Sequence, residues 1–307
     1  MSKSKNNFGL LPYVREDLYG FDPSAGQTYG WEIIKLNVQE RWRYSEGEGV
    51  KIAVIDTGCD LNHRDLKSNL IDGKNFVEPN QPPIDRNGHG THVSGTIAAS
   101  NNQTGIVGVA PKAKIMPVKA LNDQGGGSIK DIVRAIEWSV DNGADILTMS
   151  LGSPAQSKEL EQVINYAASK NKIIFCAAGN SGEAEDIMYP AKYNHTIAIG
   201  AIDRNFNRTP FTCSGETLDF LAPGHEILSC VPGDNYALMS GTSMSNPFAA
   251  GCAALLLSKY RKTKTNNYSL NSTEDYINIF KQHSINLTDY HYSGIKKYQG
   301  YGIIRPV

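Results

Sequence analysis

The chain has 307 residues, of which 40% are hydrophobic and 20% charged, the composition of an ordinary folded globular protein. Its 30 lysines and arginines nearly balance its 31 aspartates and glutamates, which leaves a net charge of −1. Nucleic-acid binders and proteins of anionic membranes usually carry a basic excess, so this balance argues against both kinds of partner. Length and composition together favour a soluble enzyme.

The N-terminal segment does not resemble a secretory signal, because Gly9 and Pro12 interrupt its short apolar stretch. No run of about 18 apolar residues, the length that spans a bilayer, occurs anywhere in the sequence. The five cysteines are scattered, odd in number and without a Cys-x-x-Cys pair, which argues against a disulfide framework and a zinc ribbon. We therefore expect a cytoplasmic protein.

From residue 50 onward, short β-branched runs alternate with helical patterns. The runs predicted to be strands buried on both faces are 50–55, 113–120, 145–151, 172–178 and 196–202. The predicted helices are 128–142, where Ser128 and Asp131 form a possible capping box, 157–170 and 273–282, and a short final strand is predicted at 300–307. This alternation predicts an α/β fold with a mostly parallel sheet and helices on both faces.

Three reactive side chains stand in turn-rich segments beside these elements. Asp56 ends an apolar run, His89 lies in the sequence Asn-Gly-His-Gly-Thr-His, and Ser243 lies in Ser-Gly-Thr-Ser-Met. Open α/β sheets gather functional groups at the carboxyl ends of their strands. A serine becomes a strong nucleophile when an imidazole takes its proton, and a buried carboxylate orients that imidazole. The three residues therefore predict an Asp-His-Ser catalytic site.

Other interpretations explain each motif separately. Asp-Thr-Gly occurs in aspartic proteases, but these need a second carboxylate motif, and the sequence has none. His89 and His92 have the spacing of metal ligands on a helix, but no His-Glu-x-x-His motif is present, and we expect His92 to be a packing residue. Asp56 could mark a structural turn, and Ser243 could be a helix cap. The co-occurrence of all three motifs favours catalysis.

The three motifs, in this order, resemble the subtilisin family of serine proteases, and the resemblance extends from about residue 29 to the end. It implies a single peptidase domain over residues 29–307 with a three-layer α/β fold. It also implies that Asp56 orients His89, that His89 acts as general base and then acid, and that Ser243 is the nucleophile. Asn180, in Ala-Ala-Gly-Asn, resembles the family's oxyanion residue, which acts together with the backbone N–H of the nucleophile.

The same resemblance implies a substrate groove between two strands, one with Gly125, Gly126 and Gly127 and the other with Ser150, Leu151 and Gly152. The alternative for the three glycines is a flexible loop. Met188 stands where the family has the floor of the main specificity pocket, usually a small residue. We therefore expect a shallow pocket that accepts small or medium apolar residues before the scissile bond.

The segment from residue 100 to 106 resembles the calcium loop of the family. The implied ligands are oxygens of Asp65, Asn102, Ser100, Thr104, Ile106 and, despite an altered spacing, Gln27. Calcium prefers six to eight oxygen ligands, which this set can approach. The alternative is a polar loop without metal.

Residues 1–28 resemble the short leader of the intracellular branch of the family, on the sequence Leu-Leu-Pro-Tyr around Pro12. The resemblance implies an inhibitor that crosses the active site and is removed by cleavage between Val14 and Tyr29. Proline has a fixed φ and no N–H, so it can hold a bound segment out of reactive register. The alternative is a disordered tail. A homodimer is an expectation from the intracellular relatives alone.

Two residues after the nucleophile depart from the family. Asn246 and Phe248 replace the usual Ser/Thr and His of the Ser/Thr-Pro-His sequence. This departure leaves open a catalytically silent binding or structural protein on the same fold. Our expectation remains an enzyme whose partners are protein or peptide substrates and its own leader, with neither nucleic acid nor membrane as a partner.

Overall fold

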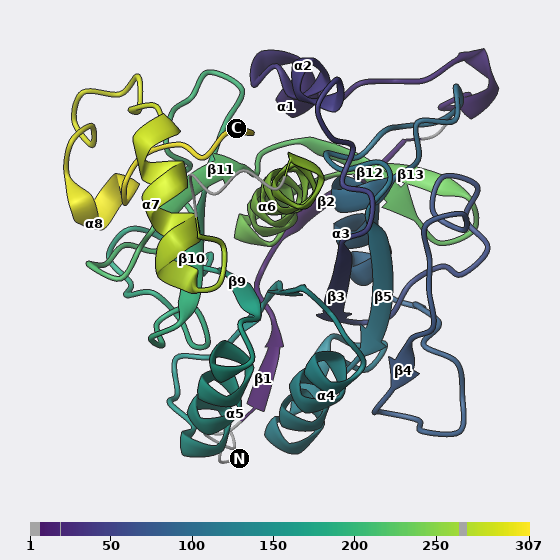
Figure 1. Cartoon of the computed structure of the whole chain (residues 1–307), viewed down its shortest axis with the longest axis horizontal. Helices are drawn as coiled ribbons and strands as arrows, with labels where there is room; N and C mark the ends of the chain where they lie inside the picture. Colours follow the sequence, from purple (N-terminus) through teal and green to yellow (C-terminus); the bar gives the residue numbers. More distant parts are fainter. Residues whose placement is uncertain (1–6, 19, 264–268) are drawn as a thin grey trace.

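The computed structural model describes residues 7–18, 20–263 and 269–307. Its centre is a seven-stranded parallel sheet (Figure 1). In spatial order the strands are β11 (Phe220–Pro223), β10 (Thr196–Ile202), β9 (Ile173–Ala177), β7 (Ile146–Met149), β3 (Lys51–Asp56), β5 (Lys114–Lys119) and β4 (Lys74–Asn75). Nearly all residues of these strands are buried, because helices cover both faces of the sheet and exclude water from the apolar side chains on each face.

Two helical layers enclose this sheet. On one side lie α3 (His89–Ala98), α6 (Thr242–Thr263) and α7 (Thr273–His283), and on the other lie α4 (Ile129–Asp141) and α5 (Lys158–Ser169) (Figure 1). Each layer packs on its own hydrophobic cluster. The predicted α/β fold with helices on both faces is therefore confirmed. The described residues also form three short helices, α1 (Trp31–Lys35), α2 (Val38–Trp42) and α8 (Lys296–Gln299), and a 3-10 turn at Pro23–Ala25.

The start of α4 shows how a side chain defines a helix boundary. The Ser128 hydroxyl accepts the backbone N–H of Asp131 at 3.0 Å, as predicted. The Asp131 carboxylate, however, accepts the Ser128 hydroxyl at 2.7 Å, so the predicted reciprocal box is not formed there. A complete capping box occurs instead at α7, between Ser272 and Asp275.

The predicted final strand at 300–307 is wrong. Ile303 makes only isolated bridges, to Leu221 and Ile285. Gly300 and Gly302 have φ values of 63° and 115°, and this left-handed backbone interrupts any extended run. The segment therefore runs as an irregular tail beside β11.

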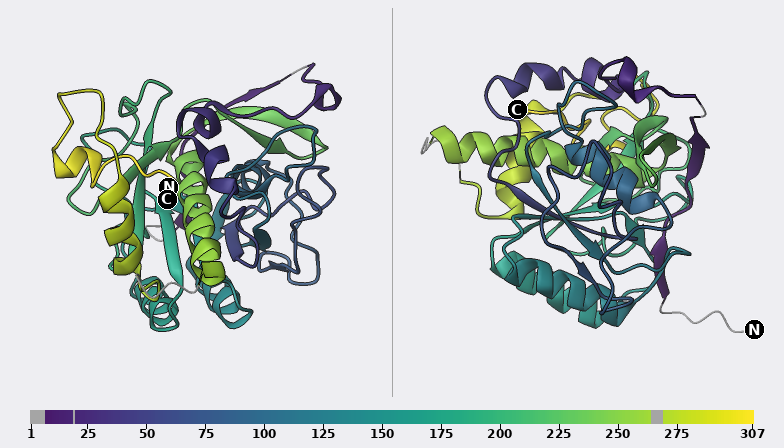
Figure 2. Two further views of the ribbon diagram at one scale, coloured as in Figure 1. Left: turned by 45° about the horizontal axis from the view of Figure 1, so that its top comes forward. Right: turned by 90° about the vertical axis from the view of Figure 1, so that its right-hand side faces the viewer.

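The N-terminal segment forms two strands on one side of the molecule (Figure 2, right). β1 (Asn7–Leu10) lies between β6 (Gly126–Ser128) and β8 (Leu151–Gly152), antiparallel to both. β2 (Val14–Asp17) pairs with β13 (Asn235–Ser240), which in turn pairs with β12 (Ile227–Val231).

All five cysteines are buried and free. The helices within the described ranges include none with the length and apolar character that crossing a bilayer requires.

Candidate active site

Asp56 and His89 meet at the carboxyl end of the central strand. Asp56 is the last residue of β3 and His89 is the first residue of α3. The imidazole Nδ1–H donates to Asp56 Oδ1 at 2.8 Å, and both side chains are essentially excluded from solvent. Asp56 Oδ1 also accepts the Thr57 N–H at 2.7 Å, and this second hydrogen bond restricts rotation of the carboxylate. This contact holds the imidazole with Nε2 free to act on another group.

Asp85, which the sequence did not single out, holds the start of α3. This buried carboxylate accepts the backbone N–H groups of Asn87, Gly88 and Thr91, together with the hydroxyls of Thr57 and Thr91. A carboxylate is favourable where a helix start leaves N–H groups without carbonyl partners. An aspartate shortly before the His-Gly-Thr-His sequence is the signal that would have found it. Asp85 thus ties the end of β3 to the helix that carries His89.

Ser243 is the second residue of α6. Its hydroxyl donates to the carbonyl oxygen of Ser150 at 3.4 Å. His89 Nε2 is buried and has no hydrogen-bond partner among the described residues. The ring of Tyr13 lies against the imidazole, with 5.1 Å between the ring centroids. The serine hydroxyl is therefore turned toward the carbonyl of Ser150, the residue before β8, and not toward His89.

The Asn180 amide faces the N-terminal segment. Its Oδ1 accepts the backbone N–H of Thr242 at 2.9 Å and the Thr242 hydroxyl at 2.8 Å. These two donors assign the oxygen of the amide, so Nδ2 must point the other way, where it donates to the Pro12 carbonyl at 2.7 Å. Thr242 was not predicted as a site residue, although it directly precedes Ser243.

The two predicted groove strands both pair with β1. Gly9 lies opposite Gly126 on one side and Gly152 on the other, and the Leu10 N–H donates to Gly125 O at 2.9 Å. Gly125 has a φ of 82°, so it forms a turn before β6 and not part of the strand. Antiparallel pairing on both edges gives the backbone N–H and C=O groups of β1 hydrogen-bond partners, whatever the side chains of β1 are.

An apolar pocket receives Leu11, which is 2% exposed. A Cβ added to Gly152 would lie 2.8 Å from Leu11 Cδ2 and 3.3 Å from Met188 Cβ. Met188 also lies beside Gly179, where an added Cβ would be 3.1 Å from Met188 Cγ. The absence of a side chain at Gly152 leaves room for Leu11 and Met188, which both lie beside it.

The predicted calcium ligands converge around Gln27. Its Nε2 donates to the carbonyls of Ser100 (2.9 Å), Thr104 (3.2 Å) and Ile106 (2.8 Å). Asp65 Oδ1 accepts from the Asn102 amide at 3.0 Å in the same cluster. These three carbonyls face one point, and rotating the Gln27 amide, whose Oε1 accepts the Gln103 N–H at 3.1 Å, would turn its oxygen to the same point. With oxygens of Asp65 and Asn102 the set contains six oxygens, which suits Ca²⁺.

A second buried cluster does not suit a metal. Ligand atoms of His63, Asp65 and Cys230 lie within 4.8 Å of one another. His63 Nε2 lies 3.1 Å from Asn235 O, and its Nδ1 accepts the Asp65 N–H at 3.2 Å. A neutral imidazole has one N–H and one lone pair, and both are used here.

His92, Asn246 and Phe248 are buried residues that pack around the site. Burial lowers the pKa of His92 to about 3, so its ring stays neutral, and Nε2 lies 3.0 Å from Ile227 O. Asn246 Nδ2 donates to Thr148 Oγ1 at 2.8 Å and Ser150 Oγ at 3.3 Å. Phe248 is buried in the cluster around α6. The Ser150 hydroxyl, which contacts Asn246, also donates to Ser243 O at 2.9 Å.

The chain is similar to known proteins over most of its length. Residues 47–302 match the Subtilase family. An intracellular serine protease of Paenibacillus polymyxa is 45% identical over 223 residues, 70% of this chain and 68% of that protein. Subtilisin DY of Bacillus licheniformis is 44% identical over 235 residues, 76% and 85% of the two chains, and Subtilisin E of Bacillus subtilis (strain 168) is 42% identical over 254 residues, 81% and 66%. The family match covers most of the chain, and the chain therefore belongs to the subtilase family of serine proteases.

Proposed function

We propose that this subtilase is an endopeptidase that cleaves peptide bonds with Asp56, His89 and Ser243. The observation that carries the proposal is the 2.8 Å contact of His89 Nδ1 with Asp56 Oδ1, beside a groove that already holds an extended segment. Ser243 Oγ attacks the substrate carbonyl carbon while its proton passes to His89 Nε2. The Asn180 amide and the Ser243 backbone N–H stabilise the resulting oxyanion.

Collapse of this intermediate breaks the C–N bond, and His89 gives its proton to the leaving amine. Water then attacks the acyl-enzyme, its proton passes to Nε2, the bond from the acyl carbon to Ser243 Oγ breaks, and the serine recovers its proton. For this sequence to start, the Ser243 hydroxyl must turn from the Ser150 carbonyl toward His89. Asp56 keeps the imidazole in the tautomer that accepts this proton.

We also propose that residues 1–28 are an inhibitory leader and that the chain is made as a zymogen. Residues 1–6 and 19 of this leader lie outside the described residues. Leu11 occupies the apolar pocket, yet the Asn180 amide holds the carbonyl of Pro12, one residue farther on. The carbonyl of Leu11, which belongs to the Leu11–Pro12 peptide bond, is thus not bound by the Asn180 amide. The Tyr13 ring against His89 and the pairing of β2 with β13 support the same non-productive register.

A preference for small or medium apolar residues before the scissile bond is supported by Met188, which lies beside Gly152, the glycine against which the Leu11 side chain also lies. A set of peptides that vary only at this position tests this preference. Faster cleavage after tyrosine or phenylalanine than after leucine or alanine would contradict it, and Met188→Gly should shift the preference toward the larger residues.

We propose a structural calcium ion at the cluster around Gln27, held by oxygens of Asp65, Asn102 and the loop carbonyls. When bound, the ion would supply positive charge that attracts the carbonyl oxygens of the loop at residues 100–106 and the Gln27 oxygen together. It would thereby link this loop to Gln27. A cytoplasmic location is supported by the Paenibacillus relative, whose name describes it as intracellular. The homodimer remains an expectation from such relatives.

The decisive experiment is the intact mass of the purified chain after incubation with calcium, beside a Ser243→Ala control. We expect the wild type alone to lose roughly its first 14–28 residues. A wild type that stays full length would show that the leader is not self-processed. A fluorophosphonate probe then separates the remaining cases, because it reacts quickly only with an activated Ser243. No reaction after removal of the leader by another protease would contradict the proposed catalysis.

A further inference from the structure

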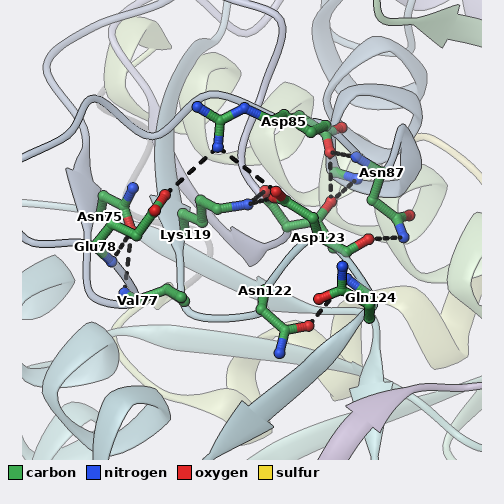
Figure 3. Close-up of polar contacts among 12 residues, drawn as sticks. Asn75, Val77, Glu78, Asp85, Asn87, Lys119, Asn122, Asp123 and Gln124 are labelled. Atoms are coloured by element: carbon green, nitrogen blue, oxygen red, sulfur yellow. Dashed lines mark hydrogen bonds and ion pairs between the residues drawn. The ribbon is translucent and has the colours of Figure 1, made fainter.

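A buried lysine connects the catalytic strand to the groove. Lys119, at the end of β5, has 1% of its side chain exposed. Its Nζ donates to the carbonyl of Thr57, next to Asp56, at 2.6 Å and to Asp123 Oδ1 at 2.8 Å (Figure 3). A buried ammonium group is costly unless it is paired and hydrogen-bonded, so Lys119 requires the carboxylate.

Asp123 makes further contacts with the loop before His89. Its backbone carbonyl accepts the Asn87 amide at 3.0 Å, and its Oδ2 lies 3.5 Å from Arg86 Nη1 (Figure 3). The same Arg86 nitrogen lies 3.5 Å from Glu78, which is farther from the groove turn. The hydrogen bond from Lys119 keeps the pKa of Asp123 below its usual range, so the carboxylate stays ionised.

Asp123 lies inside the turn that presents the groove edge. Asn122 Oδ1 accepts the backbone N–H groups of Gln124 and Gly126, both at 3.0 Å, which closes the turn. Gly125, in the same turn, accepts the Leu10 N–H of the segment in the groove. Any displacement of Asp123 therefore moves the carbonyl that pairs with an extended chain.

We propose that Asp123 is a positioning residue for extended substrates. Paired with Lys119, it fixes the turn at residues 122–126 relative to the end of β3, where Asp56 lies. The inference rests on the proposed function, in which substrates occupy the groove that β1 fills. Asp123 should therefore affect long substrates only. A short substrate that fills just the Leu11 pocket does not reach Gly125.

The test compares two substrates on active-site-titrated enzyme from each full chain. One is an N-acetyl-leucine ester, which fills only the Leu11 pocket. The other is a p-nitroanilide of Phe-Gly-Leu-Leu, the sequence of residues 8–11, which also reaches the groove edge. The variants are Asp123→Leu, Asp123→Asn, Lys119→Met/Asp123→Leu, and Glu78→Gln as the matched control that removes the other carboxylate near Arg86.

For Asp123→Leu we expect kcat/KM of the tetrapeptide to fall about tenfold, mainly through KM, and that of the ester to change less than twofold. Asp123→Asn, which keeps the side-chain size and one oxygen, should lose about threefold. The double variant should regain thermal stability because no unpaired buried charge remains, but it should keep the loss on the tetrapeptide because the contact between the turn and β3 is still missing. Glu78→Gln should leave both substrates unchanged.

An equal loss on both substrates, or no loss on either, would overturn the positioning role while leaving the proposed function intact. A wild type that gains nothing from the longer substrate would contradict the proposed groove, and this inference with it. Thermal denaturation of each variant separates a folding defect from a defect in substrate binding, and Asp123→Asn covers the case in which Asp123→Leu does not fold.

Discussion

Among single side chains, Thr242 decides which way the Asn180 amide faces. Its hydroxyl and backbone N–H both donate to Asn180 Oδ1. For Thr242→Val we expect kcat to fall about fivefold with KM unchanged, because one neutral hydrogen bond, worth about 1 kcal/mol, no longer orients the oxyanion donor. Steady-state kinetics on the processed enzyme measures the change. Thr242→Ser keeps the hydroxyl and should retain activity; a Ser variant as slow as the Val variant would assign the effect to packing.

Glu32 makes stability depend on pH. Its carboxyl folds back over Gly30, is 4% exposed, and has its pKa raised by burial from 4.5 to about 7. The folded chain therefore holds a proton that the unfolded chain has released between pH 4.5 and 7. Stability contributed by this group is fully present below pH 4.5 and falls by roughly 2–4 kcal/mol as pH rises to 7.

Glu32→Gln should remove this dependence. Urea denaturation of Ser243→Ala chains, which cannot digest themselves, at pH 5 and pH 8 measures the difference. The variant should change less between the two pH values than its parent does. The same slope in both chains would show that other groups carry the pH dependence.

At the scale of elements, the capping box of α7 joins Ser272 and Asp275. Ser272→Ala should lower the free energy of unfolding by about 1 kcal/mol, because the Asp275 N–H loses its acceptor, whereas Ser272→Gly should cost only a few tenths. Urea denaturation in the Ser243→Ala background measures both values. Equal losses for Ala and Gly would argue that the cap is not the cause.

Sequence patterns predicted β3, β5, β7, β9 and β10 together with α4, α5 and α7, because alternating apolar runs report burial, and burial dominates the middle of the parallel sheet and these helices. They missed β11 and β4, the two edge strands of that sheet, and also β12 and β13, which pair with each other and with β2 among the described residues. Motifs located Asp56, His89 and Asn180, but the contacts of Asp85, Thr242 and Lys119 join residues 28 to 62 positions apart. Single motifs carry no information about such pairings. The turn of the Ser243 hydroxyl toward Ser150 is likewise a tertiary property.

For the whole molecule, the proposed calcium site joins Gln27 to the loop around Asn102. We expect calcium at 100 times its dissociation constant to add about 2.7 kcal/mol to stability and to raise the melting temperature. Differential scanning calorimetry of the Ser243→Ala chain with and without a chelator measures this, with Mg²⁺ as the control ion. Asp65→Asn should abolish most of the shift. A melting temperature indifferent to calcium would contradict the site.

The place of Ser243 at the start of α6 has a consequence for hydrogen exchange. This helix runs through the core with its residues from Thr242 to Ser258 all buried. Amides in such a helix exchange with solvent only when the whole domain opens, whereas exposed segments such as β2 exchange through small local fluctuations. Ser243, the proposed nucleophile, thus belongs to the last part of the protein to open, and a chain weakened by heat or mutation should keep this serine in place until global unfolding.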